Sequence, residues 1–323
     1  MAKKNVNQDG LQNFLLKMMQ VSEGSLVLQE ADLKKLVSAA KFGRAQNNVL
    51  QARPYARALE KLAEKLLKDG PESSSHSLLS SSETDVVLLV VISSERGLCG
   101  GYNSNTIKAA LRAIGDIVSA GKKPVVMCIG KKAFQVLSRR KLAGGVTGGG
   151  VVQLADFTAD PSRVVIESAN SVVHLGVAFD KPSYDFAKTI AHSVESAFVA
   201  GTVSQVQVVY NQFQSAMTQV PVCETLLPLQ VSESEATASG QAIMEPAWSE
   251  LANTVLPRYV VTRFFQLTLE AIASEHGARM TAMDNATRNA KDMERRLQIT
   301  YQRARQAAIT RELIEIISGA EAL

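Results

Sequence analysis

The pattern of hydrophobic positions changes twice along the chain. Apolar residues recur at helical spacing from about residue 11 to 68 and again from about 248 to 318, which predicts a long helix at each end. From residue 85 to about 229, apolar runs of strand length alternate with helical stretches. That alternation is typical of an α/β domain.

Two polar stretches separate these zones. Residues 71–84 are rich in serine and predict a linker, and residues 231–247 predict a polar loop. We therefore expect an N-terminal helix over residues 1–70, an α/β domain over 85–230 and a C-terminal helix over 248–323.

Short elements can be predicted inside the middle zone. Residues 86–92 form a β-branched run of buried-strand length, and further strands are expected over 124–129 and 205–210. Helices are expected over 103–120 and 131–140. The glycines at 144, 145, 148, 149 and 150 predict a flexible loop without ligand chemistry.

Both helical ends carry apolar or small residues at alternating spacings of three and four. In the C-terminal helix these are Met283, Ala286, Ala290, Met293, Leu297, Thr300, Ala304 and Ala307. In the N-terminal helix they are Leu33, Leu36, Ala40, Gly43, Asn47 and Leu50. Such spacing predicts the contact line of a coiled coil, and the small residues favour close approach of the two backbones.

The C-terminal helix is too long for a compact domain. At 1.5 Å per residue it would measure on the order of 100 Å, whereas a domain of this size has a radius of gyration near ~20 Å. The fold expected is therefore a long antiparallel coiled coil of the N- and C-terminal helices, with an inserted α/β, Rossmann-like domain. The alternative is an ordinary all-α domain in which the terminal segments are core helices.

Composition and charge narrow the class of protein. Hydrophobic residues make up 46% of the 323 residues, aromatic residues only 5%, and the formal net charge is +4. These values suit closely packed helices and do not require a nucleic-acid partner. Cys99, Cys128 and Cys223 are widely spaced, which argues against a disulfide framework or a zinc site.

The termini and apolar runs give no targeting or membrane signal. The longest purely apolar run, 86–92, is far shorter than the roughly 20 residues of a membrane span. Lys3 and Lys4 precede polar residues, so no secretory signal is expected.

A nucleotide-binding enzyme is the main competing interpretation. Gly97, Gly100 and Gly101 follow a buried strand and precede a helix, a setting in which glycine turns hold phosphate. Their spacing matches neither of the common phosphate-binding motifs, so a tight structural turn is the preferred interpretation. The four histidines are scattered and show no metal-binding spacing.

A coiled-coil scaffold or a nucleic-acid binder is the second competing interpretation. The C-terminal helix is rich in arginine, but Asp284, Asp292 and Glu294 are interleaved with the basic residues. The low aromatic content also leaves little to stack on bases.

Two segments resemble the gamma subunit of F-type ATP synthases. Residues 94–103 read SERGLCGGYN, which is similar to a motif at the end of a strand in that family. Residues 274–323 are similar over their whole length and include ARMTAMDNA at 278–286 and RARQAAIT at 303–310. The resemblance extends over most of the chain from about residue 33, whereas residues 1–32 depart from the family pattern.

The resemblance implies a mechanical subunit without a catalytic site, cofactor or metal of its own. The coiled coil would stand as the central rotor shaft inside a ring of alpha and beta subunits. Rotation of a proton-driven membrane c-ring would thereby be coupled to conformational change at the catalytic sites for ATP synthesis. The α/β domain would form a foot that contacts epsilon- or delta-type stalk subunits and the c-ring.

The resemblance also implies partner contacts. Arg305, Gln306, Thr310 and Glu312 match positions where the C-terminal helix engages the catalytic ring. Arg279 matches a position that faces the beta subunit, with Lys34 opposite it on the N-terminal helix. We expect a peripheral location on the matrix side of the mitochondrial inner membrane, with the cytoplasmic side of a bacterial plasma membrane as the alternative.

Overall fold

A computed structural model describes residues 3–68, 76–140, 142–176, 183–230, 245 and 247–321, with side chains from residue 29 onward except residue 31. Contacts group the chain into two compact units, one of residues 1–38 with 280–323 and the other of residues 39–279. The predicted polar loop lies almost wholly outside the described residues. The predicted domain boundaries stay predictions.

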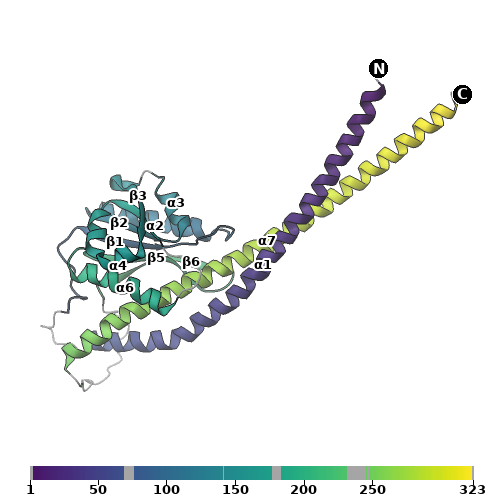
Figure 1. Ribbon diagram of the computed structural model, residues 1–323. Coiled ribbons are helices and arrows are strands. Elements are labelled where there is room, and N and C mark those ends of the chain that lie inside the picture. Colours follow the sequence, from purple (N-terminus) through teal and green to yellow (C-terminus); the bar gives the residue numbers. More distant parts are fainter. Residues whose placement is uncertain are drawn as a thin grey trace. The chain divides into compact units, whose positions relative to one another are not determined.

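Two very long helices belong to the chain. Helix α1 covers Lys3–Lys68 and helix α7 covers Trp248–Glu321 (Figure 1). Both were predicted, and each is continuous across an internal proline, at Pro54 and Pro257. The helical ends of the chain therefore follow the apolar spacing in the sequence.

A six-stranded mixed sheet lies between the two helices in sequence. Its strands are β1 (Val86–Ile92), β2 (Lys123–Ile129), β3 (Thr147–Gln153), β4 (Ser171–Gly176), β5 (Gln205–Phe213) and β6 (Gln219–Leu227). They lie in the order β3-β4-β2-β1-β5-β6, and only β6 is antiparallel to its neighbour. The α/β prediction is confirmed.

Helices cover both faces of the sheet. One face packs against α2 (Tyr102–Ser119) and α3 (Lys131–Leu137). The other packs against α4 (Leu154–Ala159), α5 (Pro161–Glu167), α6 (Tyr184–Val199) and the parts of α1 and α7 that belong to the same unit. Because strands β1 and β2 are buried on both faces, their sequences are almost continuously apolar.

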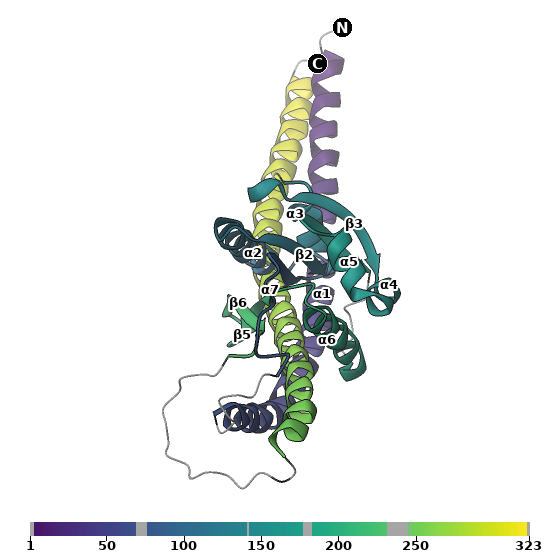
Figure 2. The same cartoon turned by 90° about the vertical axis from the view of Figure 1, so that its left-hand side faces the viewer.

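Helix α6 lies beside α7 in both views (Figures 1 and 2). The rings of Tyr184 and Phe265 meet edge to face with centroids 5.5 Å apart. Such an arrangement is favoured by the quadrupoles of aromatic rings.

The glycine-rich segment is not the loop that its composition predicts. Residues 143–145 form a short 3-10 turn and residues 147–153 form the edge strand β3. A Cβ atom at Gly148 would lie 2.4 Å from the carbonyl oxygen of Ser138, and one at Gly149 would lie 3.1 Å from that of Val172. Gly148 and Gly149 therefore allow close approach of backbones.

The serine-rich stretch is tied to the sheet over its described part. The Thr84 hydroxyl donates to the Gly201 carbonyl over 2.7 Å, and the Ser82 hydroxyl donates to that of Val203 over 3.1 Å. Leu78 is fully buried. Residues 76–84 thus pack on the domain instead of forming a free linker.

Helices α1 and α7 run in opposite directions within each unit. In the larger unit, the Trp248 indole donates to the Leu66 carbonyl over 2.9 Å, and Gly277 approaches Phe42. In the smaller unit, the Thr287 hydroxyl donates to Asp32 over 3.0 Å, and Lys35 forms an ion pair with Asp284. In each unit, the residues of α7 that contact α1 therefore have lower residue numbers as the residue numbers along α1 increase.

The predicted contact line on α1 is wrong. Leu33, Leu36 and Leu50 are 64%, 66% and 53% exposed. The buried positions of α1 are instead Ser38, Ala45, Val49, Ala56, Leu59, Ala63 and Leu66, with Phe42 half-buried. This line is displaced by two residues from the predicted one. Since each residue turns a helix by about 100°, the buried line lies on nearly the opposite side.

The contact line on α7 is correct at alternate positions. Met283 is buried, and Ala290, Leu297 and Ala304 are half-buried, as predicted. The intervening positions lie one residue later than predicted, at Thr287, Glu294 and Tyr301. Ala286 is also half-buried, as predicted, whereas Met293 is 61% exposed and Thr300 and Ala307 are also exposed, in contrast to the prediction.

Candidate partner-binding surfaces

The end of α7 carries four of the residues that the sequence assigns to partner contacts. Arg305, Gln306, Thr310 and Glu312 are all exposed on this helix. Within the described residues, no hydrogen bond or ion pair occupies their side chains. Their polar groups are therefore available to another chain.

Large apolar side chains share the same end of α7. Leu313, Ile314, Ile316 and Ile317 are 53%, 58%, 68% and 57% exposed. These aliphatic side chains contribute no free energy of burial while they are exposed to water. Exposed apolar patches of this kind commonly mark interaction sites. The polar and apolar residues together make a mixed surface suited to an enclosing protein partner.

Arg279 has a different setting from the tip residues. Its side chain is only 15% exposed and pairs with Glu275 over 2.7 Å. It also donates to the carbonyl oxygens of Arg96 and Gly97, over 3.2 Å and 3.4 Å. The guanidinium therefore joins α7 to the loop that follows β1, a role that sequence resemblance did not indicate.

Lys34 is exposed and pairs with Glu30 on its own helix. The lysine that reaches α7 is its neighbour Lys35, which forms an ion pair with Asp284. The hydrogen bond from Lys35 holds the pKa of Asp284 below its usual range, and the charge of Arg288 adds to this effect. The periodicity gave no sign of this cross-helix pair, because its residues flank the predicted contact lines.

The glycine turn after β1 is closed by internal hydrogen bonds. The Ser94 hydroxyl donates to the Arg96 carbonyl over 2.6 Å, and the Asn103 amide donates to the Ser94 hydroxyl over 2.7 Å and to the Cys99 sulfur over 3.0 Å. Leu98 and Gly100 adopt φ values of 63° and 56°. The polar groups of this turn are largely used within the protein, as expected of a structural turn.

Helix α7 fills the crevice where this type of sheet commonly binds ligands. The chain order reverses between β1 and β5, and in open α/β sheets ligands bind beyond the carboxyl ends of the strands at such a point. Here the Tyr102 hydroxyl donates to the Ala271 carbonyl over 3.1 Å, and the Ser274 hydroxyl donates to that of Asn211 over 2.9 Å. The crevice is occupied by the protein's own helix, which disfavours the nucleotide-binding interpretation.

One buried pair of titratable groups lies near the same strand ends. His174 of β4 and Glu95 approach to 4.0 Å, and each has a buried side-chain atom without a hydrogen-bond partner among the described residues. Desolvation lowers the pKa of His174, and the charge of Glu95 opposes that effect. The histidine is buried against the Phe134 ring, and its Nε2 atom has no hydrogen-bond partner in the described part of the chain.

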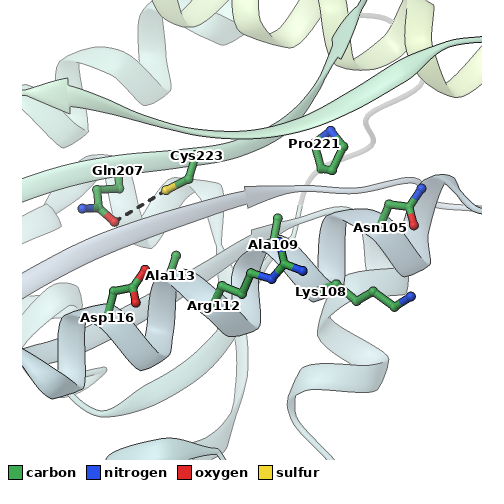
Figure 3. A pocket seen from close by; sticks show the side chains of 9 residues that line it. All are labelled: Asn105, Lys108, Ala109, Arg112, Ala113, Asp116, Gln207, Pro221 and Cys223. Carbon is green, nitrogen blue, oxygen red and sulfur yellow. Dashed lines mark hydrogen bonds between the residues drawn. The ribbon is translucent and has the colours of Figure 1, made fainter.

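An open groove of about 540 Å³ lies between α2 and the strands β5 and β6 (Figure 3). Small side chains of α2, Ala109 and Ala113, leave this space, and Lys108 and Arg112 lie along its rim. The Cys223 thiol lies 3.7 Å from the Gln207 side chain. Desolvation raises the pKa of this thiol, so the groove lacks a reactive thiolate at neutral pH.

The described part of the chain contains no cluster of three or more metal-ligating side chains. Among the same residues, no helix is both long and apolar enough to cross a bilayer.

Comparisons with known proteins agree with one another. The ATP synthase family model matches residues 33–323. The chain is 39% identical over 290 residues to the ATP synthase gamma chain of Geobacter sp. (strain M21), covering 90% of this chain and 91% of that one. It is 40% identical to that of Fuscovulum blasticum, with coverages of 90% and 92%. With that of Flavobacterium johnsoniae it is 36% identical, with coverages of 94% and 96%.

Solved structures show the same fold. A chain from the Euglena gracilis mitochondrial ATP synthase rotor has a TM-score of 0.59 at 16% identity, covering 92% of this chain and 99% of that one. A second Euglena structure, comprising OSCP, F1 and the c-ring, gives 0.60 at 18%, with coverages of 96% and 94%. The central stalk of the Tetrahymena thermophila enzyme gives 0.52 at 20%, with coverages of 79% and 98%.

The alignments with the three sequence relatives extend over nearly the full length of both chains, at identities that indicate common descent. They share the name of one subunit, and the similar folds come from the rotor and central stalk of the same machine. The chain therefore belongs to the ATP synthase gamma chain family.

Proposed function

We propose that this chain is the central-stalk rotor subunit of an F-type ATP synthase. It couples proton-driven rotation of a membrane ring to conformational change at catalytic sites on other subunits, and it is not itself an enzyme. The observation that carries the proposal is the end of α7, where Leu313, Ile314, Ile316 and Ile317 are exposed on a helix of 74 residues. A ring of enclosing subunits supplies the cover that these side chains lack.

The two long helices act in this proposal as an antiparallel coiled coil. Cross-helix contacts of Lys35 with Asp284 and of Asp32 with Thr287 support it in the smaller unit. Buried positions along α1 and α7 recur at alternating spacings of three and four, which is the period of such a structure. A paired rod resists bending and twisting better than one helix, as a drive shaft requires.

Asymmetry of the shaft is the basis of coupling. A protein shifts the conformational equilibrium of its partner only when it binds the two states differently. A shaft whose faces differ presents a different surface to each of three like catalytic sites, so each site favours a different nucleotide affinity. Rotation moves these preferences around the ring.

The partners follow from this role. The alpha and beta subunits enclose the shaft, with Arg305, Gln306, Thr310 and Glu312 as contacts at its end. The resemblance also assigns Arg279 and Lys34 to contacts with the beta subunit, and for Arg279 such a contact would add to its bonds within the chain. Exposed ion pairs suit a sliding contact, because each contributes only about 0–1 kcal/mol and can be exchanged. The sheet domain contacts stalk subunits of the epsilon or delta type and the c-ring.

The chain would then be a peripheral component of an energy-transducing membrane. The relatives with substantial identity come from bacteria, which favours the cytoplasmic side of a bacterial plasma membrane. They give no support to the mitochondrial location that we expected from the sequence.

Affinity purification of the tagged full-length chain from its native membrane tests the assignment. Recovery of alpha and beta subunits, each at three copies per copy of this chain, is expected. Recovery of the chain without them would refute the proposal.

Substitution tests the contact residues in the purified complex. Arg305→Ala and Gln306→Ala should each lower ATP turnover, whereas Arg139→Ala should not. Arg139 is an exposed arginine of the sheet domain and is the matched control. Wild-type turnover in both tip variants would contradict the assigned contacts.

A further inference from the structure

A continuous line of polar side chains crosses the interior of the larger unit. It begins on strands β5 and β6, passes along one side of α7 and ends on α1. We name it the polar clamp, and its members are Tyr210, Glu224, Arg263, Gln266, Glu270 and Arg53.

The centre of the clamp is an ion pair between the sheet and α7. The Arg263 Nε atom lies 2.7 Å from Glu224 Oε1, and the two side chains are 21% and 25% exposed. The Tyr210 hydroxyl donates to the other oxygen of Glu224 over 3.3 Å. Desolvation lowers the pKa of Arg263, but the hydrogen bond and charge of Glu224 outweigh it and raise that pKa overall. The contact with Glu224 therefore more than offsets the desolvation of the Arg263 guanidinium.

The second arm of the clamp reaches α1. Arg263 Nη1 donates to Gln266 over 3.1 Å, and the Gln266 amide donates to Glu270 over 3.3 Å. Glu270 lies 3.9 Å from Arg53 of α1, which donates to the Phe213 carbonyl at the end of β5 over 3.5 Å. Burial raises the pKa of Glu270, and the charge of Arg53 offsets part of that effect.

These contacts join elements that apolar packing alone would allow to slip. Among the described strands, β6 is at the edge of the sheet and pairs with β5 alone. Aliphatic contacts between the sheet and the helices are non-directional, so they oppose a twisting displacement weakly. Charge-assisted hydrogen bonds depend on distance and angle and oppose such a displacement directly. The clamp places bonds of this kind between β6 and α7 and between β5 and α1.

We propose that the polar clamp, and the Glu224–Arg263 pair above all, transmits torque between the sheet domain and the two long helices. This inference rests on the proposed rotor function. A ring that turns the foot must turn the shaft with it, and the clamp limits the angle by which the shaft lags behind. Glu224 and Arg263 are thus positioning residues for energy coupling.

The test uses the assembled complex in membrane vesicles. ATP hydrolysis and ATP-driven proton pumping are measured in Glu224→Gln, Arg263→Gln and the exchanged pair Glu224→Arg with Arg263→Glu. The matched control is Arg163→Gln, because Arg163 and Glu167 share the same Nε–Oε1 distance of 2.7 Å but both lie on α5, with side chains 71% and 59% exposed.

The expected result is a loss of protons pumped per ATP hydrolysed in both single variants, with ATP hydrolysis retained. The exchanged pair should recover part of that loss, and the Arg163 variant should match the wild type. Single-molecule measurement of the torsional stiffness of the shaft should show the same order of variants.

Thermal unfolding of each purified complex separates this role from simple stabilisation. Variants that melt earlier but keep the wild-type pumping ratio and stiffness would overturn the proposal. Failure of the wild-type chain to assemble with alpha and beta subunits would instead reject the rotor function itself, so the two failures are distinguishable.

Discussion

Substitution of Arg279 tests whether this residue stabilises the fold or contacts a partner subunit. The resemblance assigns this residue to a partner contact, whereas the structure turns its guanidinium towards Glu275 and the carbonyl oxygens of Arg96 and Gly97. We predict that Arg279→Ala destabilises the isolated chain, because the change removes the bonds that join α7 to the loop after β1.

The magnitude follows from the three acceptors. A hydrogen bond from a charged donor contributes about 1.5–3 kcal/mol when well formed, and the loss of one member of a buried ion pair costs about 3–5 kcal/mol. The bonds to Gly97 and Arg96 are long, at 3.4 Å and 3.2 Å, and Glu275 retains another interaction. We therefore expect a decrease of about 2–4 kcal/mol in the free energy of unfolding.

Urea unfolding of the isolated chain, followed by circular dichroism, measures this change. Arg288→Ala is the control, because Arg288 pairs with Asp284 at the same helical spacing and over 2.6 Å, but its side chain is 74% exposed. That pair should contribute less than about 1 kcal/mol.

A stability of Arg279→Ala within about 0.5 kcal/mol of the wild type, the range of a neutral surface change, would refute this reasoning. If ATP turnover of the assembled complex fell at the same time, the residue would act through a partner subunit, as the resemblance implies.

Three other predictions concern Gly130 directly after β2, the contact of Asp284 with Lys35, and the end of α7. Gly130→Ala should destabilise by about 2–6 kcal/mol in urea unfolding, because φ is 96° and the new Cβ would lie 2.1 Å from the Ser93 carbonyl oxygen. Gly115→Ala, in the interior of α2 with open space around it, should instead stabilise by about 0.5–1 kcal/mol. Amide exchange around Asp284 should be most protected above pH ~4, the ordinary aspartate value. Protection should fall as the pH drops through the lower folded pKa, except in Asp284→Asn. Deletion of residues 310–323 should weaken assembly or torque while the sheet domain keeps its circular dichroism spectrum.

Each of these has a contradicting outcome. Wild-type stability of Gly130→Ala would mean that the turn tolerates a side chain. If amide protection depends on pH equally in the wild type and in Asp284→Asn, the ion pair of Asp284 with Lys35 does not stabilise this region. Loss of all tertiary structure on deletion of residues 310–323 would show that the sheet domain depends on the helix end.

The sequence predicted three central strands of the sheet well, but it missed the central strand β4, whose buried residues 172–175 form too short an apolar run. Strand β1 has the predicted bounds, β2 begins one residue earlier, and β5 begins where expected. Strand β1 and most of β2 are continuous apolar runs, which leave little ambiguity, whereas β5 alternates polar and apolar residues before Tyr210. The edge strand β3 was missed because its glycines argue against a strand, and β6 because Pro221 and alternating polarity interrupt its pattern.

The helices show the limit of periodicity. The spacing of three and four residues predicted that both ends are long helices, but on α1 it selected the face of Leu33, Leu36 and Leu50. The buried face mixes small residues such as Ser38 and Ala45 with large ones such as Leu59, so side-chain size does not distinguish it from the predicted face. Apolar spacing therefore predicts that a segment is helical more reliably than it predicts which side of the helix is buried.

The partner contacts could not be derived from local sequence. Nothing in the spacing of Arg305 or Gln306 distinguishes them from other exposed residues of α7, and only resemblance assigned them. The polar clamp also escaped prediction, because Glu224 and Arg263 are 39 residues apart and meet only once the sheet and α7 are in place.

Helix α7 packs beyond the strand ends of the sheet and blocks the binding of a small molecule at that place. A segment held on the same chain competes at a high effective concentration and cannot diffuse away. A free nucleotide would have to displace it and break the bonds of Tyr102 and Ser274 as well. A sheet of the kind that binds metabolites in other proteins thus serves here to hold helix α7 in place.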